Sequence, residues 1–124
     1  MTNLQDMTVV LTGASGGIGR ATAEKLSAAG ARLILVGRHR EKLDSLIQDL
    51  GNDAHVAVIA DLGTEDGRHH LRKYCESLGP DGISVLVNCA GVNEFGLFEE
   101  QSQAAVADTI NINLISPMLI CQDL

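Results

Sequence analysis

A glycine-rich segment at residues 12–19 lies between a short apolar run and a stretch with helical periodicity, and it limits the possible folds more than any other feature of this 124-residue chain. Residues 8–12 are rich in β-branched side chains and predict a strand. A helix is expected from about Ile18 to Ala29, with Gly30 ending it. Glycines between a strand and a helix leave backbone N–H groups accessible at the helix N-terminus, where a diphosphate can bind.

The rest of the chain repeats this alternation of strand and helix. Further strands are expected at residues 32–36, 55–60 and 83–88, and a last helix is expected from about Ser102 to Leu124 with no stop signal. Two apolar stripes with helical spacing lie between the strands: Leu43, Leu46, Ile47 and Leu50 before Gly51, and Leu71, Tyr74, Cys75 and Leu78 before Gly79 and Pro80.

Strands that alternate with helices predict a parallel sheet covered by helices on both faces. Right-handed crossovers and a change of direction after the third strand give the order 3-2-1-4. We therefore predict the N-terminal half of a doubly wound α/β Rossmann fold. Residues 1–124 are expected to form a nucleotide-binding half-domain that is cut within its last helix and lacks the second half.

Composition excludes several classes of partner. The net charge of −7 and the pI of about 4.8 oppose binding to nucleic acid or to an anionic membrane, both of which need clustered Lys and Arg. No apolar run is expected to reach the length of about 18 residues that a membrane span needs, so a soluble protein is expected. The three cysteines form no C-x-x-C pair and are expected to be reduced, small and buried, in a cytoplasmic protein.

The glycine segment matches neither of the two most familiar phosphate-binding patterns. It is not G-x-G-x-x-G, and no Lys follows the glycines as it would in a P-loop. Polar or glycine-containing segments also follow the third and fourth strands, as Asp61-Leu62 and as Asn88-Cys89-Ala90-Gly91. The carboxyl ends of parallel strands are where an open α/β sheet binds its ligand.

Together with T-G-x-x-x-G-x-G, these segments resemble the short-chain dehydrogenase/reductase family. The resemblance implies that Gly13, Ser15, Gly16, Gly17, Ile18, Gly19, Asp61, Leu62, Asn88, Ala90 and Gly91 bind a nicotinamide cofactor, with Asp61 reaching the adenine. The family's second Asn is Cys89 here. Gly13, Gly16 and Gly19 also fit T-G-x-x-G-x-x-G of the family's extended branch, but the N-x-A-G segment favours the shorter branch.

The residues that follow the second strand indicate which cofactor is used. A carboxylate there would bind the ribose hydroxyls and repel a 2′-phosphate. This chain has Gly37 and Arg38 instead, and Ser15 adds a hydroxyl nearby, so NADP(H) is expected over NAD(H). The alternative is that Arg38 is a solvated surface charge at the start of the second helix.

The segment 110–114, Ile-Asn-Ile-Asn-Leu, resembles the family's helical motif that contributes an Asn to a catalytic tetrad. Asn113 is the best match and Asn111 a less favoured register; either could instead be a buried structural amide. Pro117 cannot donate to the carbonyl of Asn113, which predicts a kinked helix with an unpaired carbonyl, the group that holds a relay water in the family. The alternative is a helix that begins near Asn113, with Pro117 in its first turn.

The family's mechanism also needs a Ser and a Tyr-x-x-x-Lys, and the sole tyrosine here, Tyr74, is followed by Leu78 in an apolar stripe. We therefore expect a chain that is inactive alone, within a parent oxidoreductase that interconverts an alcohol and a carbonyl compound. A homo-oligomer, or association with the missing half, should cover the open fourth strand. No metal is expected, because the adjacent His69 and His70 cannot chelate one ion together.

Two other functions are compatible with a glycine-rich turn after the first strand. One is a non-catalytic nucleotide-binding or regulatory protein on the same scaffold. The other is a methyltransferase, which also places a glycine-rich loop after its first strand. Gly37 and Arg38 oppose the methyltransferase, because they stand where its ribose-binding carboxylate would be.

Overall fold

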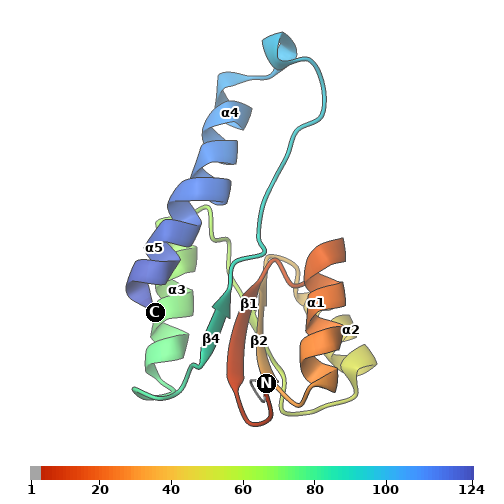
Figure 1. The fold of residues 1–124 in the computed structure, drawn as a ribbon. Coiled ribbons are helices and arrows are strands. Elements are labelled where there is room, and N and C mark those ends of the chain that lie inside the picture. The colour runs from red at the N-terminus through yellow and green to blue at the C-terminus, as the bar shows by residue number, and fades with distance from the viewer. Residues whose placement is uncertain (1–3) are drawn as a thin grey trace.

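The computed structural model describes residues 4–124 and contains a parallel sheet of four strands. The strands are β1 (Thr8–Thr12), β2 (Arg32–Gly37), β3 (Val56–Ile59) and β4 (Val85–Val87), in the order β3-β2-β1-β4 (Figure 1). Val10 of the central strand pairs with Ile34 on one side and with Leu86 on the other. The predicted order 3-2-1-4 is therefore confirmed, with β3 and β4 shorter than expected.

Helices cover both faces of this sheet. One face packs on α1 (Gly17–Ala28) and α2 (Arg40–Leu50), and the other on α3 (Glu65–Glu76) and α5 (Ser116–Asp123). Successive residues of a strand point to opposite faces. Accordingly, Val9 and Leu11 belong to the core under α1 and α2, whereas Val10 belongs to the core under α3 and α5.

Glycines and capping side chains set the helix ends. Gly51, which follows α2, adopts a left-handed conformation with φ of 64°, and Gly30, which follows α1, has φ of 89°, as the sequence predicted. Thr64 caps α3 by accepting a hydrogen bond from Gly67 N at 3.0 Å. Ser102 caps the last helix in the same way, through Ala105 N at 3.1 Å.

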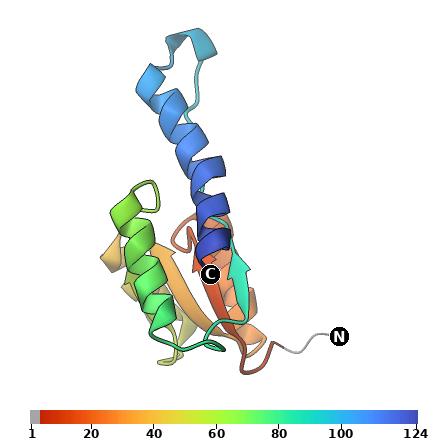
Figure 2. The same ribbon diagram turned by 90° about the vertical axis from the view of Figure 1, so that its left-hand side faces the viewer.

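The last helix is longer and less regular than the others. After a short 3-10 turn, η1 (Phe98–Glu100), it runs through α4 (Gln103–Ile110), a π-turn, η2 (Asn111–Ile115), and α5, and it extends well beyond the sheet (Figures 1 and 2). Because helical residues precede Asn113, a helix beginning near that residue is excluded. The expected irregularity before Pro117 takes the form of a π-turn, in which Ser116 N–H donates to Asn111 O.

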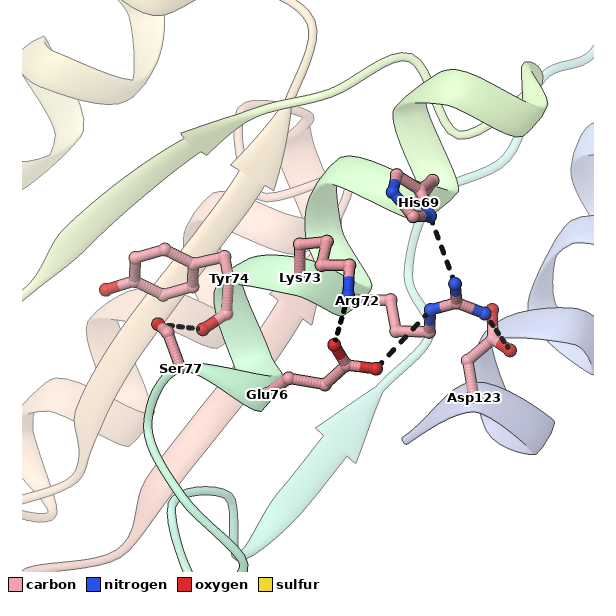
Figure 3. Close-up of polar contacts among 7 residues, drawn as sticks. All are labelled: His69, Arg72, Lys73, Tyr74, Glu76, Ser77 and Asp123. Carbon is pink, nitrogen blue, oxygen red and sulfur yellow. Dashed lines mark hydrogen bonds and ion pairs between the residues drawn. The ribbon is translucent and has the colours of Figure 1, made fainter.

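A network of polar side chains joins α3 to α5 (Figure 3). Arg72 on α3 lies 3.6 Å from Asp123 on α5 and 3.6 Å from Glu76, and its Nη2 is 3.1 Å from His69 Nδ1. A hydrogen bond from Lys73 lowers the pKa of Glu76. This network holds the end of α5 against α3.

Two expectations from the sequence were wrong. Cys75 is buried, but Cys89 is only half-buried and Cys121 is exposed, because Cys121 lies on a part of α5 that does not face the sheet core. The second wrong expectation is that no segment has the length and apolar composition of a membrane span. The helix Gln103–Asp123 has both, with a mean hydropathy of 1.4. Three of its polar side chains, Asn111, Asn113 and Ser116, form hydrogen bonds with loops of the sheet.

Candidate cofactor-binding site

A cleft of about 420 Å³ lies at the carboxyl ends of the strands. Every residue proposed for cofactor binding from the sequence lines it, except Asn88. The cleft residues come from the glycine turn, from the ends of β2, β3 and β4, and from the last helix: Gly13, Ser15, Gly16, Gly17, Ile18, Gly19, Val36, Gly37, Arg38, His39, Lys42, Ala60, Asp61, Leu62, Gly63, Cys89, Ala90, Gly91, Val92 and Ile112.

Two glycines of the turn are required by close packing. Gly13 has φ of 63°, and a Cβ there would lie 2.6 Å from Ala90 Cα. A Cβ on Gly19 would overlap the carbonyl oxygen of Gly13. By contrast, a Cβ on Gly17 would meet nothing within 4 Å, and Gly17 borders the cleft at the N-terminus of α1. Open space at a helix N-terminus is the setting in which backbone N–H groups bind phosphate.

Thr12 joins the glycine turn to the segment after β4. Its Oγ1 accepts hydrogen bonds from Cys89 N and Ala90 N, each at 3.1 Å, and the side chain is buried. Buried backbone N–H groups need such partners. The hydroxyl therefore fixes the two walls of the cleft relative to each other.

The end of β2 is rich in positive and hydroxyl groups. Arg38 lines the cleft, and Ser15 Oγ lies 3.5 Å from the position that a Cβ on Gly37 would occupy. His39 and Lys42 also line the cleft, although neither was predicted from the sequence. The available signal was position, since His39 directly follows Arg38 and Lys42 lies in the first turn of α2.

The loop after β3 is held in a tight conformation. Asp61 Oδ1 accepts a hydrogen bond from Gly63 N at 3.0 Å, and Thr64 Oγ1 donates to Asp61 O at 2.8 Å. A Cβ on Gly67 would overlap the Asp61 carbonyl oxygen, so α3 begins directly against this loop. The loop thus presents Asp61, Leu62 and Gly63 to the cleft.

The segment after β4 is held by the last helix. Asn113 Oδ1 accepts from Val92 N and Asn113 Nδ2 donates to Val92 O, both at 2.7 Å. Asn88 Nδ2 donates to Cys121 Sγ at 3.3 Å, so Asn88 braces α5 and does not border the cleft. The side chain of Asn113, proposed as catalytic, likewise acts on Val92 and is not part of the cleft wall.

Other candidate chemistry is not found in the described part of the chain. Residues 4–124 contain no group of three or more His, Cys, Asp or Glu side chains that could hold a metal ion. Tyr74 packs against the core on α3, near the network of Figure 3, and is not among the residues that line the cleft.

A glycine turn at a helix N-terminus, a parallel sheet and a cleft at its strand ends together define a Rossmann-type nucleotide-binding site. The chain belongs to the short-chain dehydrogenase family, whose model, described as short chain dehydrogenase, matches residues 7–124.

Curated relatives and solved structures agree with this family. Nodulation protein G from Rhizobium sp. (strain N33) is 35% identical over 100% of this chain and 50% of its own length. The 3-oxoacyl-acyl-carrier-protein reductase FabG of Aquifex aeolicus is 32% identical over 97% of the chain and 49% of its own length. A short-chain dehydrogenase/reductase from Brucella melitensis, titled glucose/ribitol dehydrogenase, superposes with a TM-score of 0.87 and 36% identity, covering 99% of this chain and 52% of that one. The chain thus spans about half the length of these relatives.

Proposed function

We propose that this chain is the cofactor-binding part of an NADP(H)-dependent oxidoreductase that interconverts an alcohol and a carbonyl compound. The observation that carries the cofactor preference is the chemistry at the end of β2. Arg38, His39 and Lys42 line the cleft there together with Ser15, and residues 37–39 include no carboxylate.

A 2′-phosphate on the adenosine ribose would be bound by these groups. The guanidinium of Arg38 and the ammonium of Lys42 supply charge, and Ser15 supplies a hydroxyl beside Gly37. A hydrogen bond to a charged group contributes about 1.5–3 kcal/mol, or roughly a tenfold to hundredfold preference for the phosphorylated cofactor.

The other cleft residues suit the rest of a dinucleotide. The N-terminus of α1 borders the cleft and can bind the diphosphate, and residues 61–63 and 89–92 line the cleft where the chain leaves β3 and β4. Bound nicotinamide would supply a hydride acceptor or donor. Asn113 is the one residue of this chain that we assign to the catalytic tetrad. It would contribute its backbone carbonyl and the two hydrogen bonds that its side chain makes with Val92.

The name of one relative supports this substrate class. FabG of Aquifex aeolicus is named as a 3-oxoacyl-acyl-carrier-protein reductase, and a 3-oxo group is a carbonyl group. We propose a small carbonyl or alcohol substrate for the full-length protein, with the Ser, Tyr and Lys of the reaction supplied outside this chain. A cytoplasmic location fits the three free cysteines.

We also propose that the full-length protein covers the apolar surface of the last helix, by its second half or in a homo-oligomer. Ile110, Leu114 and Met118 are each at least 50% exposed, and β4 is at the edge of the sheet. An exposed apolar patch beside an unpaired strand edge is typical of a surface that is covered in the assembled protein.

Titration of the full-length protein with NADPH and NADH tests the cofactor preference. Wild-type protein should bind NADPH at least tenfold more tightly, and Arg38→Asp should reverse the preference. Arg40→Asp is the matched control, because it makes the same change in net charge two residues away and Arg40 does not line the cleft. NADH bound as tightly as NADPH by the wild-type protein would overturn the proposal.

A further inference from the structure

The last helix contacts the two cleft segments that follow β3 and β4 through different side chains. We call residues 61–63 the β3 end and residues 89–92 the β4 end. We infer that Asn111 and Ser116 are positioning residues that hold the β3 end in shape to bind the adenosine part of the cofactor. This inference rests on the proposed binding of a nucleotide in the cleft, but it does not depend on the preference for NADP(H) over NAD(H).

The contacts with the β3 end are short and specific. Asn111 Nδ2 donates to Gly63 O at 2.7 Å, and Ser116 Oγ donates to Leu62 O at 2.7 Å. Ser116 is only 1% exposed, so its hydroxyl is shielded from water and bonds to the Leu62 carbonyl instead. A Cβ on Gly63 would lie 3.2 Å from Ile112 Cγ1, which shows how closely the helix packs on the loop.

The π-turn brings these two donors to the same side of the helix. In a regular α-helix, residues five apart are about 140° apart around the axis, because each residue turns the helix by about 100°. Here Ser116 N–H donates to Asn111 O, an i to i+5 bond that places residue 116 above residue 111. Both side chains can therefore reach consecutive carbonyls of one loop.

The β3 end is held from its other side by α3 and by its own side chains. Arg68 Nη1 also donates to Leu62 O, at 3.0 Å, and Asp61 Oδ1 accepts from Gly63 N. Leu62 O therefore keeps a donor when the Ser116 hydroxyl is removed. Loss of the Asn111 amide should consequently affect the loop more than loss of the Ser116 hydroxyl.

The β4 end has a separate anchor on the same helix. The Asn113 side chain makes two hydrogen bonds to Val92, whereas the bonds to the β3 end come from Asn111 and Ser116. The two ends can therefore be disturbed one at a time, by substitutions two residues apart. This separation allows a positioning role to be distinguished from general damage to the helix.

The test uses the full-length protein with 2′,5′-ADP and 5′-AMP, which carry only the adenosine part of the cofactor, and with NADPH. Asn111→Ala should weaken the binding of the adenosine fragments and of NADPH by the same factor, about threefold to tenfold, as expected for one lost hydrogen bond. Asn111→Asp keeps the shape of the side chain but has no N–H donor, so it should bind these ligands no more tightly than Asn111→Ala. Ser116→Ala should have a smaller effect in the same direction, and kcat at saturating cofactor should stay unchanged for all three.

Thr109→Ala is the matched control, since Thr109 Oγ1 donates to Ala105 O within the helix itself. It should leave fragment binding unchanged, and Asn113→Ala should do so as well while lowering kcat. Thermal unfolding without ligand reports any general loss of stability. Wild-type affinity for both fragments in folded Asn111→Ala protein would overturn the inference. Tighter binding of 5′-AMP than of 2′,5′-ADP by the wild type would overturn the NADP(H) proposal alone, and binding of neither fragment would overturn both.

Discussion

The carboxamide of Asn113 forms two hydrogen bonds of 2.7 Å with the backbone of Val92, one to its N–H and one from its amide to the carbonyl. A side chain that binds both polar groups of one residue fixes that residue as a neighbouring strand would. Asn113→Asp should lose one of these bonds and place a carboxylate oxygen against the Val92 carbonyl.

We therefore expect Asn113→Asp to lower the free energy of unfolding by about 1–3 kcal/mol, and to lower kcat of the full-length enzyme more than it raises the Kd of cofactor. Urea denaturation and steady-state kinetics check the two parts. A variant with unchanged kcat would show that this brace has no part in catalysis.

Thr12 provides a second test of how the cleft is built. Thr12→Val keeps the shape of the side chain but leaves Cys89 N and Ala90 N without the oxygen that they now bind. Because Thr12 is buried, we expect a loss of about 2–4 kcal/mol in the free energy of unfolding. Thr12→Ser keeps the oxygen, and its free energy of unfolding should fall by less than half as much as that of Thr12→Val. Equal losses for the two variants would contradict the role of the hydroxyl.

The glycine turn predicts different results at two of its positions. Gly13→Ala combines a left-handed φ of 63° with a Cβ placed 2.6 Å from Ala90 Cα, and it should destabilise the fold by more than about 2 kcal/mol. Gly17→Ala has open space and should leave stability unchanged or raise it by up to about 1 kcal/mol. Chemical denaturation of the two variants measures both effects, and a Gly13→Ala protein of wild-type stability would refute the packing argument.

His55 predicts a dependence of stability on pH. Leu33 N–H donates to its Nδ1 at 3.2 Å, so the neutral ring carries its proton on Nε2, which lies 2.7 Å from Ser27 Oγ. Burial lowers the pKa of His55 below its value of about 6.5 in an unfolded chain. The unfolded chain therefore binds this proton more readily, and stability is fully present above about pH 6.5 and is lost as the pH falls toward the lowered value.

Unfolding free energies measured from about pH 8 to about pH 5.5 should thus fall more steeply for the wild type than for His55→Leu. Glu76, whose pKa is also lowered, begins to protonate only below this range and is present in both proteins. His39, His69 and His70 are present in both the wild type and His55→Leu, so they do not account for a difference between the two slopes. Equal slopes would show that His55 does not contribute.

Periodic patterns and strand ends predicted most of the fold. The alternation of β-branched runs with helical stripes is local, and it was enough to place the four strands, their order and the helices that cover them. Gly51 and Ser102 marked helix boundaries correctly, because capping depends on residues within one turn.

Features that depend on distant partners were not predicted. Asn111 binds a carbonyl 48 residues away and Ser116 one 54 residues away, so neither contact has a local signature. His39 and Lys42 were overlooked in the cleft because charged residues at a helix start are usually solvated. The exposure of Cys121 depends on which face of α5 meets the sheet, which no spacing of three cysteines reveals.

The π-turn at 111–115 amounts to one residue more than a regular helix would hold in the same turn. Removing Ile112 would restore the usual bonding and leave the residues after the π-turn in place, but it would also remove the side chain that packs on Gly63. Removing a residue between the π-turn and Ile120 would instead rotate every later residue by about 100° about the axis, and Ile120 would leave the core it shares with Leu71. Insertions and deletions should therefore be tolerated at residues 93–97, where the chain forms neither helix nor strand, and rejected between the π-turn and Ile120, so that the length of this part of the helix is constrained more tightly than the identity of its exposed side chains.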